Sequence, residues 1–298
     1  MAETLQRRTV GGRAFDSLNV LFLLLFTVTV VYPFWHLMII SFSGTDDIVT
    51  MGFHFWLDEW HIEAYRYVFS SNRVGRAYVN SILRVAMGTT TAIMVTLLAA
   101  YPLAKRDLPG RNVITMTFVF TMFFAGGLIP HYLLVRGLGL IDSRWALVLP
   151  VALDVFWVII MRNFLMAIDV EMEEAAFMDG ASVRTILVRI IVPLARPAIA
   201  TVFLWATVQH WNAWFDALIF IQDANKTVLQ LLLRRLLDRM LTLQELERFT
   251  LQQQIEMKIP TEAAKAAMIL VATGPIIMIY PFIQRHFVRG IMIGSLKG

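Results

Sequence analysis

The chain has 298 residues, of which 58% are hydrophobic and only 16% are charged, with no cysteine and a formal net charge of +4. A soluble domain has about 25% charged residues, so lipid is the expected solvent for much of this chain. The absence of cysteine excludes disulfides and thiolate metal sites, and the scattered charge argues against a nucleic-acid face, which needs a dense basic stripe.

Six hydrophobic windows are long enough to cross a membrane, which takes about 20 apolar residues per helix. In chain order they cover residues 18–42, 80–104, 113–135, 145–161, 198–221 and 266–283. The first is too long for a signal-peptide core and no small-residue cleavage site follows it, so we expect it to be retained. All six should be helices, because a sheet edge cannot satisfy its hydrogen bonds in lipid. The sequence therefore predicts an all-α membrane protein with one six-span domain, residues 1–298.

The positions of lysine and arginine predict the orientation. Lys105, Arg106 and Arg111 crowd the very short loop between the second and third windows, and short loops weigh most in the positive-inside rule. We therefore expect both termini in the cytoplasm. Residues 43–79 and 222–265 then form two folded caps on the outer side.

Three charged side chains inside the predicted spans each have two interpretations. Asp216 is a functional candidate because intramembrane carboxylates are costly, but it would equally suit a helix end or a pair with a neighbour. Arg84 is near the outer end of its span, so we favour snorkelling over contact with a substrate. Asp154 could pair with a partner subunit or make a local hydrogen bond.

The loop of residues 169–197, after the fourth window, predicts two short helices that meet at a tight turn. Asp169 is placed to cap the first helix, whose early turns are acidic, as the helix dipole favours. Gly180 can take the left-handed conformation that ends a helix, and Ser182 can cap the next one. So compact a helical turn in the cytoplasm suggests that another protein docks there.

The same loop carries a specific spacing. The series is Glu174-Ala175-Ala176, then Gly180, Ile190 and Val192-Pro193. It resembles the EAA loop of ABC-importer permeases, with Val192 in place of the family's leucine. In that family the loop forms a coupling helix in a cleft of the nucleotide-binding subunit. The resemblance implies that a separate ATPase is contacted by Glu173, Glu174, Ala175, Ala176, Asp179, Gly180, Ala181 and Pro193.

Further stretches resemble the carbohydrate-type permeases, such as the smaller permease of the maltose transporter. Residues 211–216 are similar to a Trp-Asn-x-aromatic element of that group. Residues 100–103, 126–130, 138–140 and 227–234 resemble a branch that includes importers of alginate or pectin fragments. Aromatic faces and hydrogen-bonding groups suit sugar rings, so our candidates for the substrate path are Trp211, Asn212, Trp214 and Asp216. The tryptophans could instead fill the bundle or sit in an interfacial belt.

The chain has no GxxxxGK[ST] loop, so we expect no cofactor here, no enzymatic activity, and ATP and Mg²⁺ bound by separate ATPase subunits. The resemblance implies a permease of the bacterial inner membrane that moves an oligosaccharide or polysaccharide, neutral or acidic, by alternating access. Its expected partners are a second homologous permease, two ATPase subunits and an extracytoplasmic solute-binding protein.

Two other functional classes fit less well. A secondary transporter driven by an ion gradient often has an internal repeat and more intramembrane acids, and it would leave the 169–197 loop unexplained. A membrane enzyme would need a cluster of His, Asp or Ser at one interface, and the six histidines are scattered without metal spacing.

Overall fold

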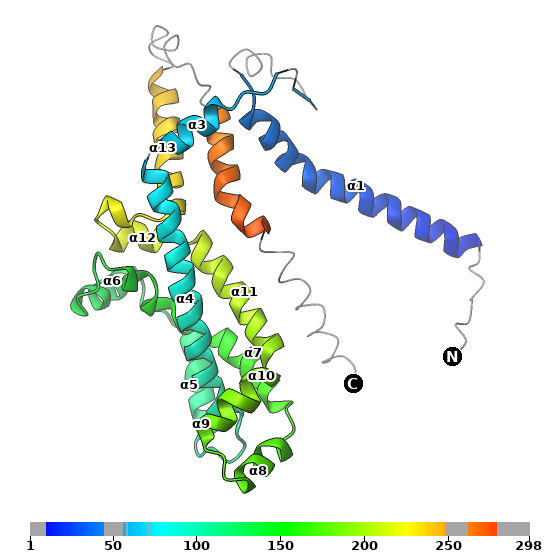
Figure 1. The fold of residues 1–298 in the computed structure, drawn as a ribbon, viewed down its shortest axis with the longest axis vertical. Helices are drawn as coiled ribbons and strands as arrows, with labels where there is room; N and C mark the ends of the chain where they lie inside the picture. Colours follow the sequence, from blue (N-terminus) through cyan, green and yellow to red (C-terminus); the bar gives the residue numbers. More distant parts are fainter. Residues whose placement is uncertain (1–9, 45–55, 58, 71, 248–261, 279–298) are drawn as a thin grey trace. The chain divides into compact units, whose positions relative to one another are not determined.

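The computed structural model describes residues 10–44, 56–57, 59–70, 72–247 and 262–278. Within these ranges every regular element is a helix, so the predicted all-α class is confirmed (Figure 1). The chain forms two compact units. The first unit is Met1–Ser70 with Met240–Val271, and the second is Ser71–Arg239 with Ala272–Gly298.

The first unit contains the long helix α1 (Val10–Ser41) and the short helix α3 (Glu63–Ser70). Residues 14–41 of α1 form a candidate membrane span with no buried position in its most apolar window. Its end is tied to α3, because Ser41 Oγ and Tyr65 Oη are 2.9 Å apart and the rings of Phe42 and Tyr65 lie 4.8 Å apart. A further helix begins at residue 262 and is described up to residue 278.

The second unit is built around α4 (Asn72–Ala104), which packs against α7 (Val155–Met166) and α11 (Arg196–Asn212). Apolar side chains, many of them small, form its core, and these three helices contribute Ala92, Ala100, Met161, Val202 and Ala206. Small residues let helix backbones approach closely, which favours helix association within lipid.

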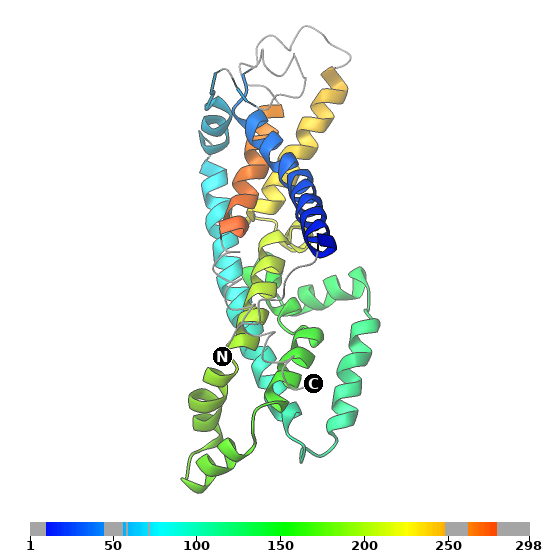
Figure 2. The same cartoon turned by 90° about the vertical axis from the view of Figure 1, so that its right-hand side faces the viewer.

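The remaining labelled helices connect these three along the chain or follow α11. They are α5 (Arg111–Phe123), α6 (Leu128–Gly137), η1 (Arg144–Leu147), η2 (Leu149–Val151), α8 (Glu171–Met178), α9 (Val183–Ile186), η3 (Leu187–Ile191), α10 (Val192–Leu194), α12 (Phe215–Phe220), η4 (Ala224–Lys226) and α13 (Leu229–Glu247). Both views place α8 and α9 at one end of the second unit, near the end of α4 (Figures 1 and 2).

Fewer of the described helices are long and straight enough to cross a membrane than the six sequence windows predict. Two described helices are long and apolar enough by themselves, at residues 14–41 and 72–104, and the number rises to five if each of three bent pairs is one span. The bends are 114° between α5 and α6, 54° between η1–η2 and α7, and 78° between residues 183–194 and α11. The predicted window 266–283 runs past residue 278, outside the described residues.

The breaks have local causes. Gly127, with φ 84° and ψ 176°, stands between α5 and α6 in a conformation that only glycine adopts readily, so window 113–135 is not one helix. Window 145–161 begins as 3₁₀ turns and becomes α-helical after Asp154. Window 198–221 is interrupted after Asn212, where Ala213 is extended. Hydrophobic length alone does not register such backbone turns.

Candidate functional site

The loop of residues 169–197 contains the two predicted short helices, α8 and α9. Gly180 has φ +78°, as a left-handed helix terminator requires, and Ala181 N–H donates to the Ala176 carbonyl across the turn at 2.9 Å. Ser182 Oγ accepts from Thr185 N–H and caps α9 as predicted. The predicted cap of α8 was wrong: the helix starts at Glu171 after Val170, and no side chain caps it.

Helix α8 has two different faces. Its outward face exposes Glu174 and the large apolar side chains of Met172, Phe177 and Met178, the last of them 88% exposed. Its inward face carries Ala176, which packs against the core of the second unit, and the buried Glu173. The candidate coupling residues therefore divide between the two faces, a distinction that their adjacency in the sequence hides.

The Glu173 carboxylate makes its contacts with other residues of this chain. Its Oε2 pairs with Lys105 Nζ and also accepts a hydrogen bond from Tyr101 Oη at 3.0 Å. Lys105 Nζ lies 4.6 Å from the centre of the Tyr101 ring. These three residues, which we call the Glu173 triad, join α8 to the end of α4.

The chain beyond the turn departs from regular α-helix. Helix α9 passes into the π-helical segment η3, and Pro193 lies in the first turn of α10. Proline has no N–H to donate to the carbonyl four residues earlier, which fits a local change of hydrogen-bonding pattern around it. Of the remaining candidate coupling residues, Ala175, Asp179 and Gly180 are exposed, and Ala181 is half-buried beside the core.

A second polar cluster lies where α11 gives way to α12. Arg84, only 3% exposed, forms an ion pair with Asp216, and its Nη1 donates to Asp216 Oδ1 at 3.1 Å and to the Ala213 carbonyl at 3.0 Å. Asp216 is therefore paired with a neighbour, and Arg84 does not snorkel, which corrects the interpretation we favoured from sequence. Asp154 caps α7 by accepting from Phe156 N–H at 2.8 Å, so its local hydrogen bond is confirmed.

The other candidate path residues are placed differently from one another. Trp211 is buried, with its indole N–H donating to the Ala272 carbonyl at 2.9 Å and its ring edge against Tyr78. Asn212, at the end of α11, is exposed. Trp214 is half-buried beneath the Arg234 guanidinium, which lies 5.2 Å from its ring centre. Trp211 is therefore packed within the chain, whereas Asn212 is exposed and Trp214 is partly covered.

The sequence does not indicate that one of the histidines is buried in the helix packing. His210 is 2% exposed, and neither ring nitrogen has a hydrogen-bond partner within the described residues. Its ring packs against Gly88, where a Cβ would come within 2.2 Å of Nε2. The glycine thus admits the histidine between α4 and α11, and no local sequence signal joins two residues so far apart.

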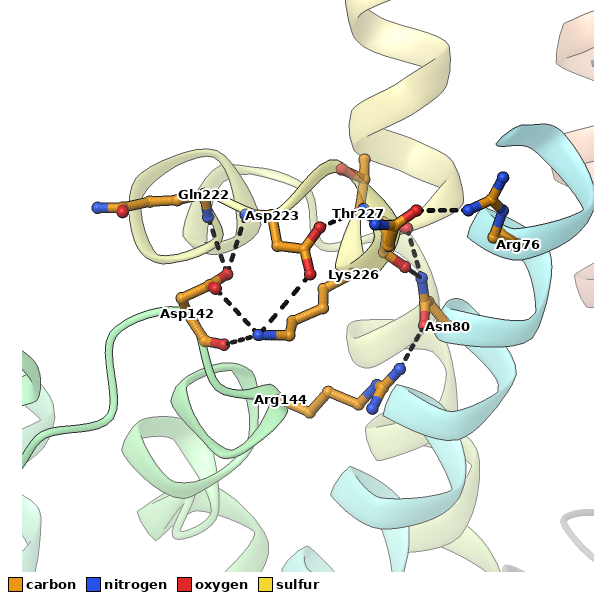
Figure 3. A network of polar contacts seen from close by, with 9 residues as sticks. Arg76, Asn80, Asp142, Arg144, Gln222, Asp223, Lys226 and Thr227 are labelled. Atoms are coloured by element: carbon orange, nitrogen blue, oxygen red, sulfur yellow. Dashed lines mark hydrogen bonds and ion pairs between the residues drawn. The ribbon is translucent and has the colours of Figure 1, made fainter. Parts of the chain in front are cut away.

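A polar network joins the chain around residues 140–144, the segment 222–227 and the start of α4 (Figure 3). Lys226 Nζ reaches Asp142 Oδ2 at 2.9 Å, and Asp142 Oδ1 accepts from Asp223 N–H at 3.0 Å. These backbone and lysine donors hold the pKa of the Asp142 carboxyl below its usual value. Asn80 continues the network by accepting from Arg144 at 3.0 Å.

The described ranges contain no group of three or more His, Asp or Glu side chains arranged to hold a metal ion. The polar groups that the fold brings together are instead the Glu173 triad, the Arg84–Asp216 pair and the network of Figure 3. All three lie in the second unit and connect segments distant in sequence.

Comparison with known proteins gives full-length matches, although no protein-family model matches the sequence. The polygalacturonan/rhamnogalacturonan transport system permease protein YtcP of Bacillus subtilis (strain 168) is 37% identical over 287 residues, covering 96% of this chain and 99% of that protein. Protein LplC of the same organism is 39% identical over 290 residues, covering 97% of each chain.

Two solved structures of transporter chains are similar to this chain in fold. A chain in the crystal structure of a bacterial ABC transporter involved in the import of the acidic polysaccharide alginate has a TM-score of 0.82 and 31% sequence identity, covering 94% of this chain and 98% of that one. A chain of the bacterial alginate ABC transporter in complex with an alginate pentasaccharide-bound periplasmic protein is 16% identical with a TM-score of 0.52, and shows a likeness of fold alone.

Proposed function

This chain belongs to the permease subunits of ABC sugar importers, and from that premise we propose that it forms one half of a carbohydrate pathway through the bacterial inner membrane, driven by ATP hydrolysis in separate subunits. The observation that carries the coupling to ATP is the α8 turn. Its left-handed Gly180 ends a helix whose outward face exposes large apolar side chains beside Glu174, and the described part of this chain does not cover them.

The outward face of α8 suits an ATPase cleft. Met172, Phe177 and Met178 offer apolar contact, and exposed patches of this kind mark interaction sites. Glu174 lies among them with its carboxylate exposed, so it can make a charge-assisted bond to a basic group of the partner. Two ATPase subunits, each binding ATP and Mg²⁺, would then draw two such helices together and rock the permeases between inward-facing and outward-facing states.

A second, homologous permease accounts for further uncovered surface. Helix α5 has no buried residue, and Val113, Met116 and Phe123 on it are each at least 69% exposed. Lipid covers such a face in part, but a pathway for a hydrophilic sugar requires a second wall. The full importer also includes an extracytoplasmic solute-binding protein, and the six-span arrangement has both termini in the cytoplasm.

The proposed substrate is an acidic oligosaccharide or polysaccharide. One relative is named for polygalacturonan and rhamnogalacturonan transport, and a structural neighbour for import of alginate. In this chain Asn212, Trp214 and Asp216 cluster at the α11–α12 break, and Arg234 lies over the Trp214 ring. An aromatic face beside amide, carboxylate and guanidinium groups matches the hydroxyls and carboxylates of such sugars.

Purification of the tagged chain from its native host tests the coupling. We expect an ATPase to copurify with the wild type, and Gly180→Val to lose it or to lose coupled hydrolysis, because a β-branched residue is strained at φ +78°. Gly137→Val is the matched control, since Gly137 also has open space around it but no left-handed backbone. Full ATPase association and transport in Gly180→Val would contradict the coupling assignment.

Cysteine labelling tests the orientation, and the chain has no native cysteine to interfere. Ala224 and Asp107 are both exposed. We expect Ala224→Cys to react with an impermeant maleimide from outside and Asp107→Cys to react only after the membrane is opened. The reverse pattern would refute cytoplasmic termini.

Uptake of oligogalacturonates, alginate oligosaccharides and neutral maltodextrins by cells with and without the chain tests the substrate class.

A further inference from the structure

The inward face of α8 carries a contact that docking of an ATPase does not explain. Glu173 stands beside the exposed Glu174 in the sequence, yet its side chain points into the chain and ends on Lys105 and Tyr101. Resting on the proposed function, we propose that the Glu173 triad is the positioning contact through which movement of α8 reaches the membrane helix α4.

The chemistry of the triad suits transmission of a directed movement. The Glu173 side chain is 12% exposed and that of Lys105 is 33% exposed, so the carboxylate is largely withdrawn from water while the lysine keeps partial access to it. Tyr101 donates to the same carboxylate oxygen at 3.0 Å, and Lys105 also sits over the Tyr101 ring. Charge-assisted hydrogen bonds fix distance and direction, whereas apolar packing between helices is non-directional.

The triad also lies at the end of α4, which is a long, unbroken helix. Helix α4 runs unbroken from Asn72 to Ala104, directly before Lys105. Tyr101 and Arg84 are separated on it by 101 − 84 = 17 residues, about 26 Å along the axis at 1.5 Å per residue. The same continuous helix thus connects the triad to the Arg84–Asp216 pair at the α11–α12 break.

A neighbouring bond anchors α7 at the same end of α4. Arg162 Nε donates to the Leu103 carbonyl at 3.0 Å, and Leu103 is buried in the core shared by α4, α7 and α11. Displacement of the end of α4 therefore displaces the packed core with it. By contrast Arg106, one residue after Lys105, is exposed and forms no ion pair within the described part of the chain, which makes it a matched control.

The test uses the chain purified with its ATPase in lipid nanodiscs, carrying Ala224→Cys as a reporter. The measurement is the change in maleimide labelling of that cysteine when MgATP and vanadate are added, together with the amount of ATPase retained. We expect Lys105→Gln and Glu173→Gln to retain the ATPase but to reduce the labelling change about fivefold or more, as loss of a typical coupling energy does. Arg106→Gln should match the wild type.

Charge exchange separates the contact from general structural damage. The double variant Lys105→Glu with Glu173→Lys should restore the labelling change to within about twofold of wild type, because the pair is rebuilt with reversed polarity. Tyr101→Phe removes one hydroxyl and should lower the change less than either Gln variant. If the Gln variants fail to accumulate in the membrane, these two variants decide the matter.

Three outcomes would overturn the inference while leaving the proposed function standing. These are an unaltered labelling change in both Gln variants, no recovery in the charge-exchanged variant, or loss of the ATPase from Glu173→Gln alone, which would make Glu173 a direct docking residue. If no ATPase copurifies with the wild type, the proposed function itself fails, and the inference falls with it.

Discussion

Removal of the Asp216 carboxylate should expose the cost of a buried, unpaired guanidinium. In Asp216→Ala, Arg84 remains 3% exposed, and the Ala213 carbonyl at 3.0 Å is the one acceptor that it keeps within the described residues. Breaking a buried ion pair by deleting one partner costs about 3–5 kcal/mol. The Asp216 side chain is 23% exposed, so water partly compensates, and the lower end, about 3 kcal/mol, applies.

The assay is thermal unfolding of the purified chain in detergent. A chain of this size loses about 2 °C of Tm per kcal/mol, so Asp216→Ala should lower the Tm by about 6 °C. The matched control is Asp238→Ala, which removes a carboxylate paired with Arg234 at 3.3 Å where both side chains are more than half exposed. Exposed pairs contribute about 1 kcal/mol or less, so this Tm should fall by no more than about 2 °C.

A double variant separates the structural role of the pair from a role in the substrate path. Arg84→Met with Asp216→Leu replaces both charges by apolar groups, which is often neutral for stability, so most of the lost Tm should return. If Asp216 also binds sugar, transport should stay low in this stable variant. A Tm for Asp216→Ala within about 1 °C of wild type would refute the reasoning, because it would mean that Arg84 finds another partner at no cost.

Two further predictions follow from the second unit. Gly88→Ala should reduce membrane levels of the chain and lower its Tm, because the new methyl group would collide with the His210 ring, whereas Gly75→Ala on the same helix meets open space and should leave both unchanged. Donors from Asp223 and Lys226 depress the pKa of Asp142, so its carboxylate stabilises the fold above about pH 4 and loses that effect as the pH falls through its folded pKa. Tm measured against pH should therefore fall less steeply below pH 4 in Asp142→Asn, and identical profiles would contradict this.

The sequence by itself determined the features that depend on local chemistry. Apolar windows identified a helical membrane protein, because lipid demands backbone hydrogen bonds within each segment. The acidic turn before Gly180 predicted a helix, a left-handed residue and a cap at Ser182, and all three are present. The spacing of the same turn indicated the permease family, which full-length relatives confirm.

Only the tertiary structure decided how the charged residues are used. Glu173 and Glu174 are adjacent and identical in type, yet one is buried on Lys105 and the other faces outward. Asp216 meets Arg84 across 132 residues of chain, and His210 fits only because Gly88 has no side chain. Local patterns place a residue on a helix but do not state which face of it another helix will cover. That choice follows from packing between distant segments, where one buried charge must find its partner or be excluded.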